Sequence, residues 1–331
     1  MRNMILFAER PPFGAACIGD ATKGMAIMRF IRCAALALML TPTLSAAQNL
    51  DVGLTAARAG DFATALSELR PLAEQGDALA QHNLGVMYYN GHGVLQDFAE
   101  AARLYRLAAE QGFAAAQSNL GAMYSEGQGL VKDYGEAAKL YRLAAEQGDK
   151  TAQFNLGFAY QHGQGVNQDI NEAIEWYRSA AEQGLTFAQA NLGAVFAYGK
   201  GVPQDNVKAV QWWRMAAEGG DALSQSRLGF AYANGEGVPQ DYTEAAKWLK
   251  LAAKKGDVTA QFNLGGQYQH GLGVVQDYAT AHMWYNIAAA KGDKQAGALR
   301  DTLADRMTND AISEAQKRAR ECMASSYQDC D

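Results

Sequence analysis

The sequence predicts an all-α fold, a right-handed superhelical α/α solenoid of 36-residue helix-turn-helix repeats, from three observations. A Leu-Gly pair recurs six times at a constant spacing of 36 residues, beginning at Leu84-Gly85. An aromatic residue, a Gly-x-Gly segment, an Asp and an Ala-Ala pair follow each Leu-Gly pair in the same register. The chain has 331 residues, of which 49% are hydrophobic and 19% charged, so it is too apolar to be disordered.

The first helix of each repeat is expected to bury one face. In residues 77–88, Ala80, Leu84 and Tyr88 fall at i, i+4 and i+8, which places them on one side of a helix. Gly85 has no side chain, so the second helix of the repeat can approach closely. That packing must offset the cost of about 1 kcal/mol for glycine inside a helix.

The second helix has recognisable start and stop signals. Asp97 is expected to cap it, and Glu100 to complete a capping box, as a Glu does in four of the six repeats. The preceding Gly-x-Gly segment supplies backbone angles that other residues resist, and Gly112 ends the helix. Such a hairpin cannot bury its own apolar face, so stacked neighbours must bury it.

The N-terminal region resembles an export signal. Residues 28–47 are interpreted as a secretory signal peptide, with Arg29 and Arg32 before a short apolar run and cleavage after Ala47. Residues 1–27 lack these features and are interpreted as a mis-assigned upstream start. The mature chain is then expected to be periplasmic or secreted, with no stable membrane span. The alternative is a cytosolic protein with an apolar N-terminal helix.

Shorter regions flank the six repeats, which occupy residues 77–292. Residues 48–76 are expected to form an N-terminal partial repeat or cap, and residues 293–331 a pair of capping helices. Cleavage leaves two cysteines, Cys322 and Cys330. Because an exported chain meets an oxidising compartment, we expect these two to form a disulfide. The alternative is a pair of free thiols.

The repeat pattern resembles the Sel-one-like repeat (SLR), a relative of the tetratricopeptide repeat, from Asp61 to Gly292. One stretch carries the pattern in Gly165-Val-Asn-Gln-Asp169, Ala173, Trp176-Tyr177, Ala180-Ala181-Glu-Gln-Gly184 and Asn191-Leu-Gly193. The resemblance implies an adaptor that holds proteins together, in bacterial envelopes, in host interaction or in quality control in the endoplasmic reticulum. One exported branch of the family, with a disulfide in each repeat, is linked to penicillin binding, but this chain lacks those cysteines.

The resemblance also implies that the first helices line a concave face. One position on that face is Asn in five repeats, where the side chains would bind a peptide backbone or a neighbouring turn. The sixth is Arg227, which could meet a carboxylate or a phosphate. The aromatic side chains would anchor a partner or pack between repeats. The predicted groove residues are Asn83, Asn119, Phe154, Asn155, Phe158, Phe187, Asn191, Arg227, Phe230, Phe262 and Asn263.

Charge and motifs argue against other classes. The formal net charge of -6 disfavours nucleic-acid binding. The sequence has no Ser-x-x-Lys, Gly-x-Ser-x-Gly, His-Glu-x-x-His or Gly-x-x-x-x-Gly-Lys-Ser/Thr motif. The five His are dispersed, and His92 in a Gly-x-Gly turn is expected to be solvated, so we expect neither a metal nor a cofactor.

We therefore predict an exported, non-catalytic scaffold that binds an envelope or host protein on its concave face. The alternative is a cell-wall-related enzyme or a muropeptide or β-lactam binder.

Overall fold

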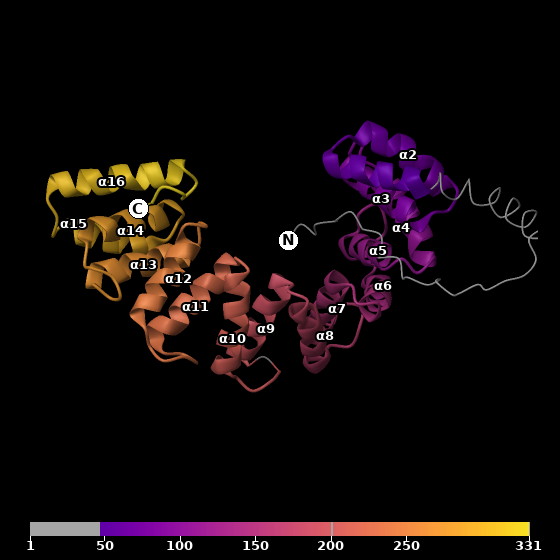
Figure 1. The fold of residues 1–331 in the computed structure, drawn as a ribbon. Coiled ribbons are helices and arrows are strands. Elements are labelled where there is room, and N and C mark those ends of the chain that lie inside the picture. The colour runs from indigo at the N-terminus through magenta and orange to yellow at the C-terminus, as the bar shows by residue number, and fades with distance from the viewer. Residues whose placement is uncertain (1–46, 200, 331) are drawn as a thin grey trace, which may run out of the picture. The chain divides into compact units, whose positions relative to one another are not determined.

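The computed structural model describes residues 47–199 and 201–330. The segments interpreted as an upstream start and a signal peptide lie outside the described residues, apart from Ala47. In the described part, helices and turns account for the chain and no strand is present (Figure 1). The all-α solenoid predicted from the repeats is confirmed. No helix in this part is both long and apolar enough to cross a membrane.

The chain divides into two compact units between Gln168 and Asp169. The first unit contains a helix at residues 47–59 and then α2 (Phe62–Glu74), α3 (Ala78–Asn90), α4 (Phe98–Glu110), α5 (Ala114–Glu126), α6 (Tyr134–Glu146) and α7 (Lys150–His162). The second unit contains α8 (Ile170–Glu182), α9 (Thr186–Tyr198), α10 (Asn206–Glu218), α11 (Ala222–Asn234), α12 (Tyr242–Ala253), α13 (Val258–His270), α14 (Tyr278–Ala290), α15 (Lys294–Ala304) and α16 (Asn309–Ala324). The odd-numbered helices from α3 to α13 are the first helices of the repeats, called helix A below. The even-numbered helices from α4 to α14 are the second, called helix B.

An Asp caps each helix B, but the predicted capping box does not form. Asp97 Oδ1 accepts a hydrogen bond of 3.0 Å from the backbone N–H of Glu100. The box would require the Glu100 side chain to bond the backbone N–H of Asp97. That N–H already donates to the carbonyl of Tyr88 at the end of helix A, at 3.0 Å. Glu100 instead pairs with Arg103 at 2.6 Å. Glu136 and Glu244 repeat this arrangement. In their repeats too, the backbone N–H of the capping Asp donates to the carbonyl of a Tyr at the end of helix A, and the Glu pairs with a Lys.

In five of the six repeats, the glycine that follows the recurring Leu brings helices A and B together, as predicted. A Cβ at this position would lie 2.3–2.8 Å from a side chain of helix B in the same repeat, closer than real Cβ contacts. In the last repeat, for example, Gly265 faces the ring of Tyr285, which is almost fully buried. The positions are Gly85, Gly121, Gly193, Gly229 and Gly265.

The second glycine of each turn is also required by its surroundings. Gly273 has φ +69°, and a Cβ there would lie 2.1 Å from the carbonyl oxygen of Tyr242, at the start of the preceding helix B. A side chain would therefore meet both a backbone clash and an unfavourable φ. The turn therefore packs directly against the start of the second helix of the preceding repeat.

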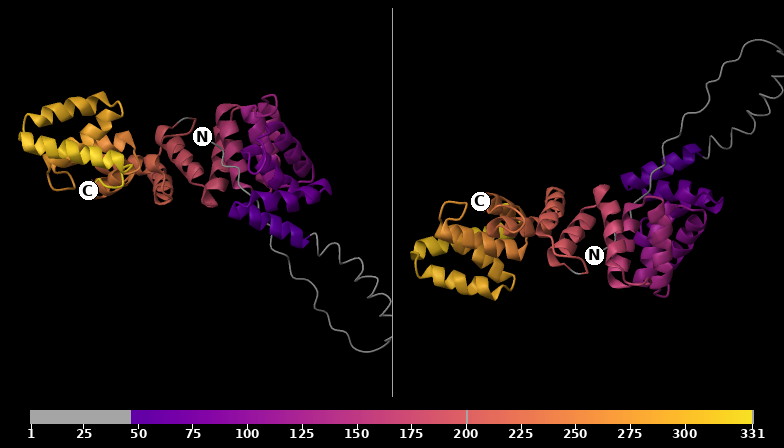
Figure 2. Two further views of the ribbon diagram at one scale, coloured as in Figure 1. Left: turned by 90° about the horizontal axis from the view of Figure 1, so that it is seen from above. Right: turned by 90° about the horizontal axis from the view of Figure 1, so that it is seen from below.

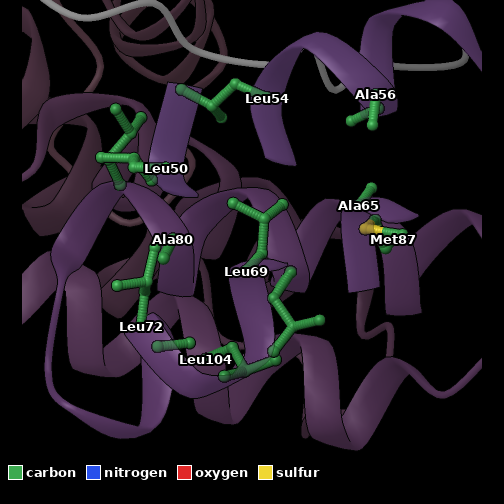
Figure 3. Close-up of a cluster of buried hydrophobic side chains, with 13 residues drawn as sticks. Leu50, Leu54, Ala56, Ala65, Leu69, Leu72, Ala80, Met87 and Leu104 are labelled. Atoms are coloured by element: carbon green, nitrogen blue, oxygen red, sulfur yellow. The ribbon is translucent and has the colours of Figure 1, made fainter. Parts of the chain in front are cut away.

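Residues 47–59 and α2 cover the apolar end of the first repeat (Figure 3). Leu50 and Leu54 of the N-terminal helix pack into one cluster with Leu69 and Leu72 of α2. The same cluster reaches Leu104 in α4. This N-terminal segment thus buries an apolar surface that would otherwise face water.

The C-terminal helix α16 packs along α14, as the views in Figure 2 also show. In α14, Thr280 and Met283 stand where the first repeat has the ion pair of Glu100 and Arg103. The outward face of α14 is therefore apolar, and α16 buries it: Met283, Trp284 and Ile287 form a cluster with Ala319 and Cys322 of α16. Arg318 donates hydrogen bonds of 3.2 Å to Thr280 Oγ1. A disulfide joins Cys322 to Cys330, with 4.6 Å between their Cα atoms.

A pair of neighbouring glycines in α13 tests the close approach of helices A and B. Gly265→Ala is expected to lower the free energy of unfolding by about 1–3 kcal/mol, because its Cβ would overlap the buried Tyr285 ring. Gly266→Ala is the matched control, since its Cβ would meet only the Tyr285 hydroxyl, at 3.5 Å. The control should be neutral or stabilise by up to about 1 kcal/mol, through helix propensity. Urea denaturation followed by circular dichroism measures both. Equal effects would show that the glycine is not needed for packing.

Candidate functional site

A buried glutamine near the start of helix A joins each repeat to the one before it. Its side-chain amide donates a hydrogen bond of 3.0–3.2 Å to a carbonyl at the end of the preceding helix B or, in the first repeat, of α2. The six pairs are Gln81–Ala73, Gln117–Ala109, Gln153–Ala145, Gln189–Ala181, Gln225–Ala217 and Gln261–Ala253. This glutamine was not among the predicted site residues, although the position is Gln in all six repeats. The bond fixes where the next helix A lies, and so shapes the surface between repeats.

Three clefts occupy the same place in the repeat, between the end of one helix A, the following helix B and the next helix A. We call them the α7, α11 and α13 clefts, after the last helix of each. Their volumes are about 250, 390 and 370 Å³. The α7 cleft lies between α5, α6 and α7 in the first unit. The α11 cleft, between α9, α10 and α11, and the α13 cleft, between α11, α12 and α13, lie in the second.

Some of the predicted groove residues line these clefts. Phe154, Asn155 and Phe158 lie together in the α7 cleft, as expected from their i, i+4 spacing. Arg227 lines the α11 cleft and Asn263 the α13 cleft. Phe230 lines both, and its side chain is 47% exposed.

Other predicted groove residues have structural partners. Asn83 and Asn191 each donate a hydrogen bond of 2.8 Å to the carbonyl one turn earlier in their own helix. The Asn119 amide bonds His82 at 3.0 Å. Phe262 packs against Tyr285, with 5.8 Å between ring centroids, whereas Phe187 is 52% exposed. At the Asn position, three of the five Asn side chains therefore bond other groups of the protein: two within their own helix and one across to the preceding repeat.

Arg227 is held between aromatic rings. Its guanidinium carbon lies 5.4 Å from the ring centroids of both Tyr198 and Trp213. It also donates a hydrogen bond to the Tyr198 hydroxyl. Cation–π contacts of this kind hold a charged group in place without neutralising it. The α11 cleft therefore presents a fixed positive charge beside the exposed side chains of Leu223 and Phe230.

Burial shifts the pKa of several groups that do not line the clefts. His82 is fully buried, which lowers its pKa to about 3, and burial also lowers the pKa of His282. Burial raises the pKa of Tyr285 to about 12. His92, predicted to be solvated, is only half-exposed: its ring stacks on Phe62 at 4.4 Å, because the turn folds back onto α2. The described residues hold no cluster of three His, Cys, Asp or Glu side chains that could bind a metal ion.

Comparison with known proteins identifies the repeats. The Sel1 repeat family model matches residues 78–113, 114–149, 150–185, 186–221, 222–257 and 258–293. The chain belongs to the Sel1 repeat family. Sel1 repeat proteins are generally non-catalytic scaffolds that bind other proteins.

Solved structures agree with this assignment. A Sel1 repeat protein from Oxalobacter formigenes is 38% identical, with a TM-score of 0.64, over 72% of this chain and 96% of that one. The protective antigen c5321 of uropathogenic Escherichia coli, which displays an SLR fold, is 29% identical, with a TM-score of 0.55, over 84% of this chain and 69% of that one. Among curated proteins, no sequence matches this chain.

The buried His82 in the first Sel1 repeat is expected to make stability depend on pH. Unfolded His binds a proton near pH 6.5, whereas folded His82 stays neutral down to about pH 3. The unfolded state therefore gains protons as the pH falls below 6.5. His82 then lowers the free energy of unfolding by up to about 1.4 kcal/mol per pH unit, with no such effect above pH 6.5.

Replacing His82 isolates this contribution. Between pH 7.5 and pH 5.0, urea denaturation should show wild type losing about 1–2 kcal/mol more stability than His82→Gln. Ser226, buried at the equivalent position of a later repeat, gives the control: Ser226→Ala should keep the wild-type pH dependence. A His82→Gln curve parallel to wild type would contradict the assignment.

Proposed function

We propose that this Sel1 repeat protein is an exported, non-catalytic scaffold that binds a segment of another protein on its helix-A face. The observation that carries the proposal is the recurrence of one cleft at equivalent positions in three repeats. A ligand that runs from the α11 cleft to the α13 cleft meets the same geometry in two successive repeats. Extended polypeptides have this kind of regularity.

Exposed apolar side chains support a protein partner. Phe158 is 37%, Phe230 47% and Leu223 51% exposed, and all three line the clefts. Aromatic side chains at the centre of an interface commonly supply much of the binding energy. Covering these side chains with a partner would remove apolar surface from water.

Two features support export. Residues 28–47 have the charge and apolar pattern of a signal peptide. Cys322 and Cys330 are joined in a disulfide, which persists in oxidising compartments and is rare in the cytosol. An envelope or host protein is the partner class that fits this location.

The test is affinity capture with tagged mature protein, residues 48–331, from the envelope fraction of the source cells, followed by mass spectrometry. We expect the double variant Phe158→Ser and Phe230→Ser to lose the captured partner at least about 10-fold, because two cleft anchors are removed. The double variant Leu143→Ser and Leu251→Ser is the control, since these exposed leucines lie on helix B and line none of the three clefts.

Both variants must keep the helical circular dichroism of the wild type. Loss of capture in the helix B control, with capture retained in the cleft variant, would place the binding surface elsewhere. Turnover or covalent labelling of a β-lactam by the purified protein would contradict the non-catalytic proposal.

A further inference from the structure

We propose that the α11 and α13 clefts together bind an extended acidic peptide segment of a partner protein. An Asp or Glu side chain of the peptide would lie on Arg227, and the backbone N–H and C=O of one peptide residue would bond the amide of Gln267. This inference rests on the proposed function and deepens it by naming the chemistry of the partner.

The two clefts are neighbours and share a wall. Phe230 lines both, with the α11 cleft on one side and the α13 cleft on the other. Both lie in the second unit, and their lining residues are equivalent positions of successive repeats. A ligand that fills both must pass Phe230 and extend on each side of it. An internal stretch of chain does this, so the carboxylate comes from a side chain rather than from a chain terminus.

Arg227 supplies the charge that selects an acidic residue. It replaces the Asn of the other five repeats. Tyr198 and Trp213 hold its guanidinium at 5.4 Å from each ring centroid. In the described part of the chain, no carboxylate lies within ion-pair distance of it, although Glu236 lines the same cleft. A guanidinium has five N–H donors, and the bond to Tyr198 uses one, so donors remain for a planar carboxylate.

Gln267 supplies an amide that has no partner within the protein. Its side chain is 5% exposed and lines the α13 cleft. Across the described residues, neither its Nε2 nor its Oε1 makes a hydrogen bond. The equivalent residues of the other repeats are all apolar: Met87, Met123, Ala159, Val195 and Ala231. A buried amide without partners destabilises the fold, so its presence at a cleft indicates a ligand that bonds both atoms.

The backbone of one extended peptide residue matches that amide. The Gln amide offers an NH2 donor and a carbonyl acceptor side by side, and one residue of an extended chain offers its own C=O and N–H on the same side in return. Gly266 precedes Gln267, where the other repeats have Val, Ala or Phe, so no side chain at this position narrows the cleft. Apolar side chains flanking the acidic residue would then cover the exposed Leu223 and Phe230.

The experiment uses mature protein and a library of nine-residue peptides, acetylated at the N-terminus and amidated at the C-terminus, so that any carboxylate is a side chain. Wild type is expected to select peptides with an Asp or Glu at a fixed position. Arg227→Asn, which restores the residue of the other repeats, should weaken binding of a selected peptide by about 10- to 100-fold. The same peptide with Asn or Gln in place of the acid should bind wild type and Arg227→Asn equally.

Gln267→Met separates a binding role from a structural one. Met occupies the equivalent position in two other repeats, so the variant should fold. We expect it to weaken peptide binding by about 5-fold or more and to raise the urea midpoint, because an unpartnered buried amide is removed. A structural role for Gln267 would instead lower the midpoint and overturn this part of the proposal.

Three other results would overturn the proposal. One is selection of peptides without an acidic position, and another is binding only when the library has free C-terminal carboxylates. The third is binding of no peptide by wild type. If capture from cells depends on Phe158 and Phe230 but the protein does not prefer acidic peptides, this inference fails and the proposed function stands. If acidic peptides bind through Arg227 but capture does not depend on the cleft residues, the proposed function fails instead.

Discussion

The hydrogen bond from a buried glutamine to the end of the preceding helix B is the interaction on which the repeat-to-repeat arrangement depends. The glycine between helices A and B sets the spacing inside a repeat, but it acts only within that repeat. The glutamine bond crosses the boundary, as between Gln117 and Ala109 at 3.1 Å. In the first two repeats a second glutamine extends it, with Gln111 donating to Gln81 and Gln147 to Gln117 at 2.8 Å. Because the bond is buried, water does not compete for it.

Equivalent clefts follow from equivalent repeats, and the proposed ligand is selected by the differences between them. A cleft at one place in the repeat is a consequence of packing and by itself selects no ligand. In the proposed binding mode, selectivity comes from positions where one repeat departs from the others. Arg227 and Gln267 are two such departures, and both line adjacent clefts in the second unit. Each carries a cost, partial burial of a charge and burial of an unpartnered amide, that packing alone does not explain.

The periodic features of the fold could be predicted from the sequence, because each acts within one repeat. The helix pairs, the close approach at Gly85 and the cap at Asp97 all involve residues a short distance apart in the chain. The capping box was wrong because a carbonyl of the preceding helix uses the backbone N–H of Asp97. The role of Gln81 was missed, although its recurrence was visible, because its acceptor belongs to the repeat before it. The sequence cannot show that the Gln267 amide lacks hydrogen-bond partners, because this depends on the position of every polar group around it in the fold.

The most direct test of the glutamine bond reverses its polarity. Gln117→Glu keeps the shape of the side chain but places a carboxylate against the Ala109 carbonyl in a buried site. We expect it to lower the free energy of unfolding by at least about 2 kcal/mol at pH 7.5, measured by urea denaturation. Gln211→Glu on α10 is the control: its side chain is exposed and its carboxylate faces water, so the loss should stay below about 1 kcal/mol. A Gln117→Glu protein as stable as the control would contradict the account.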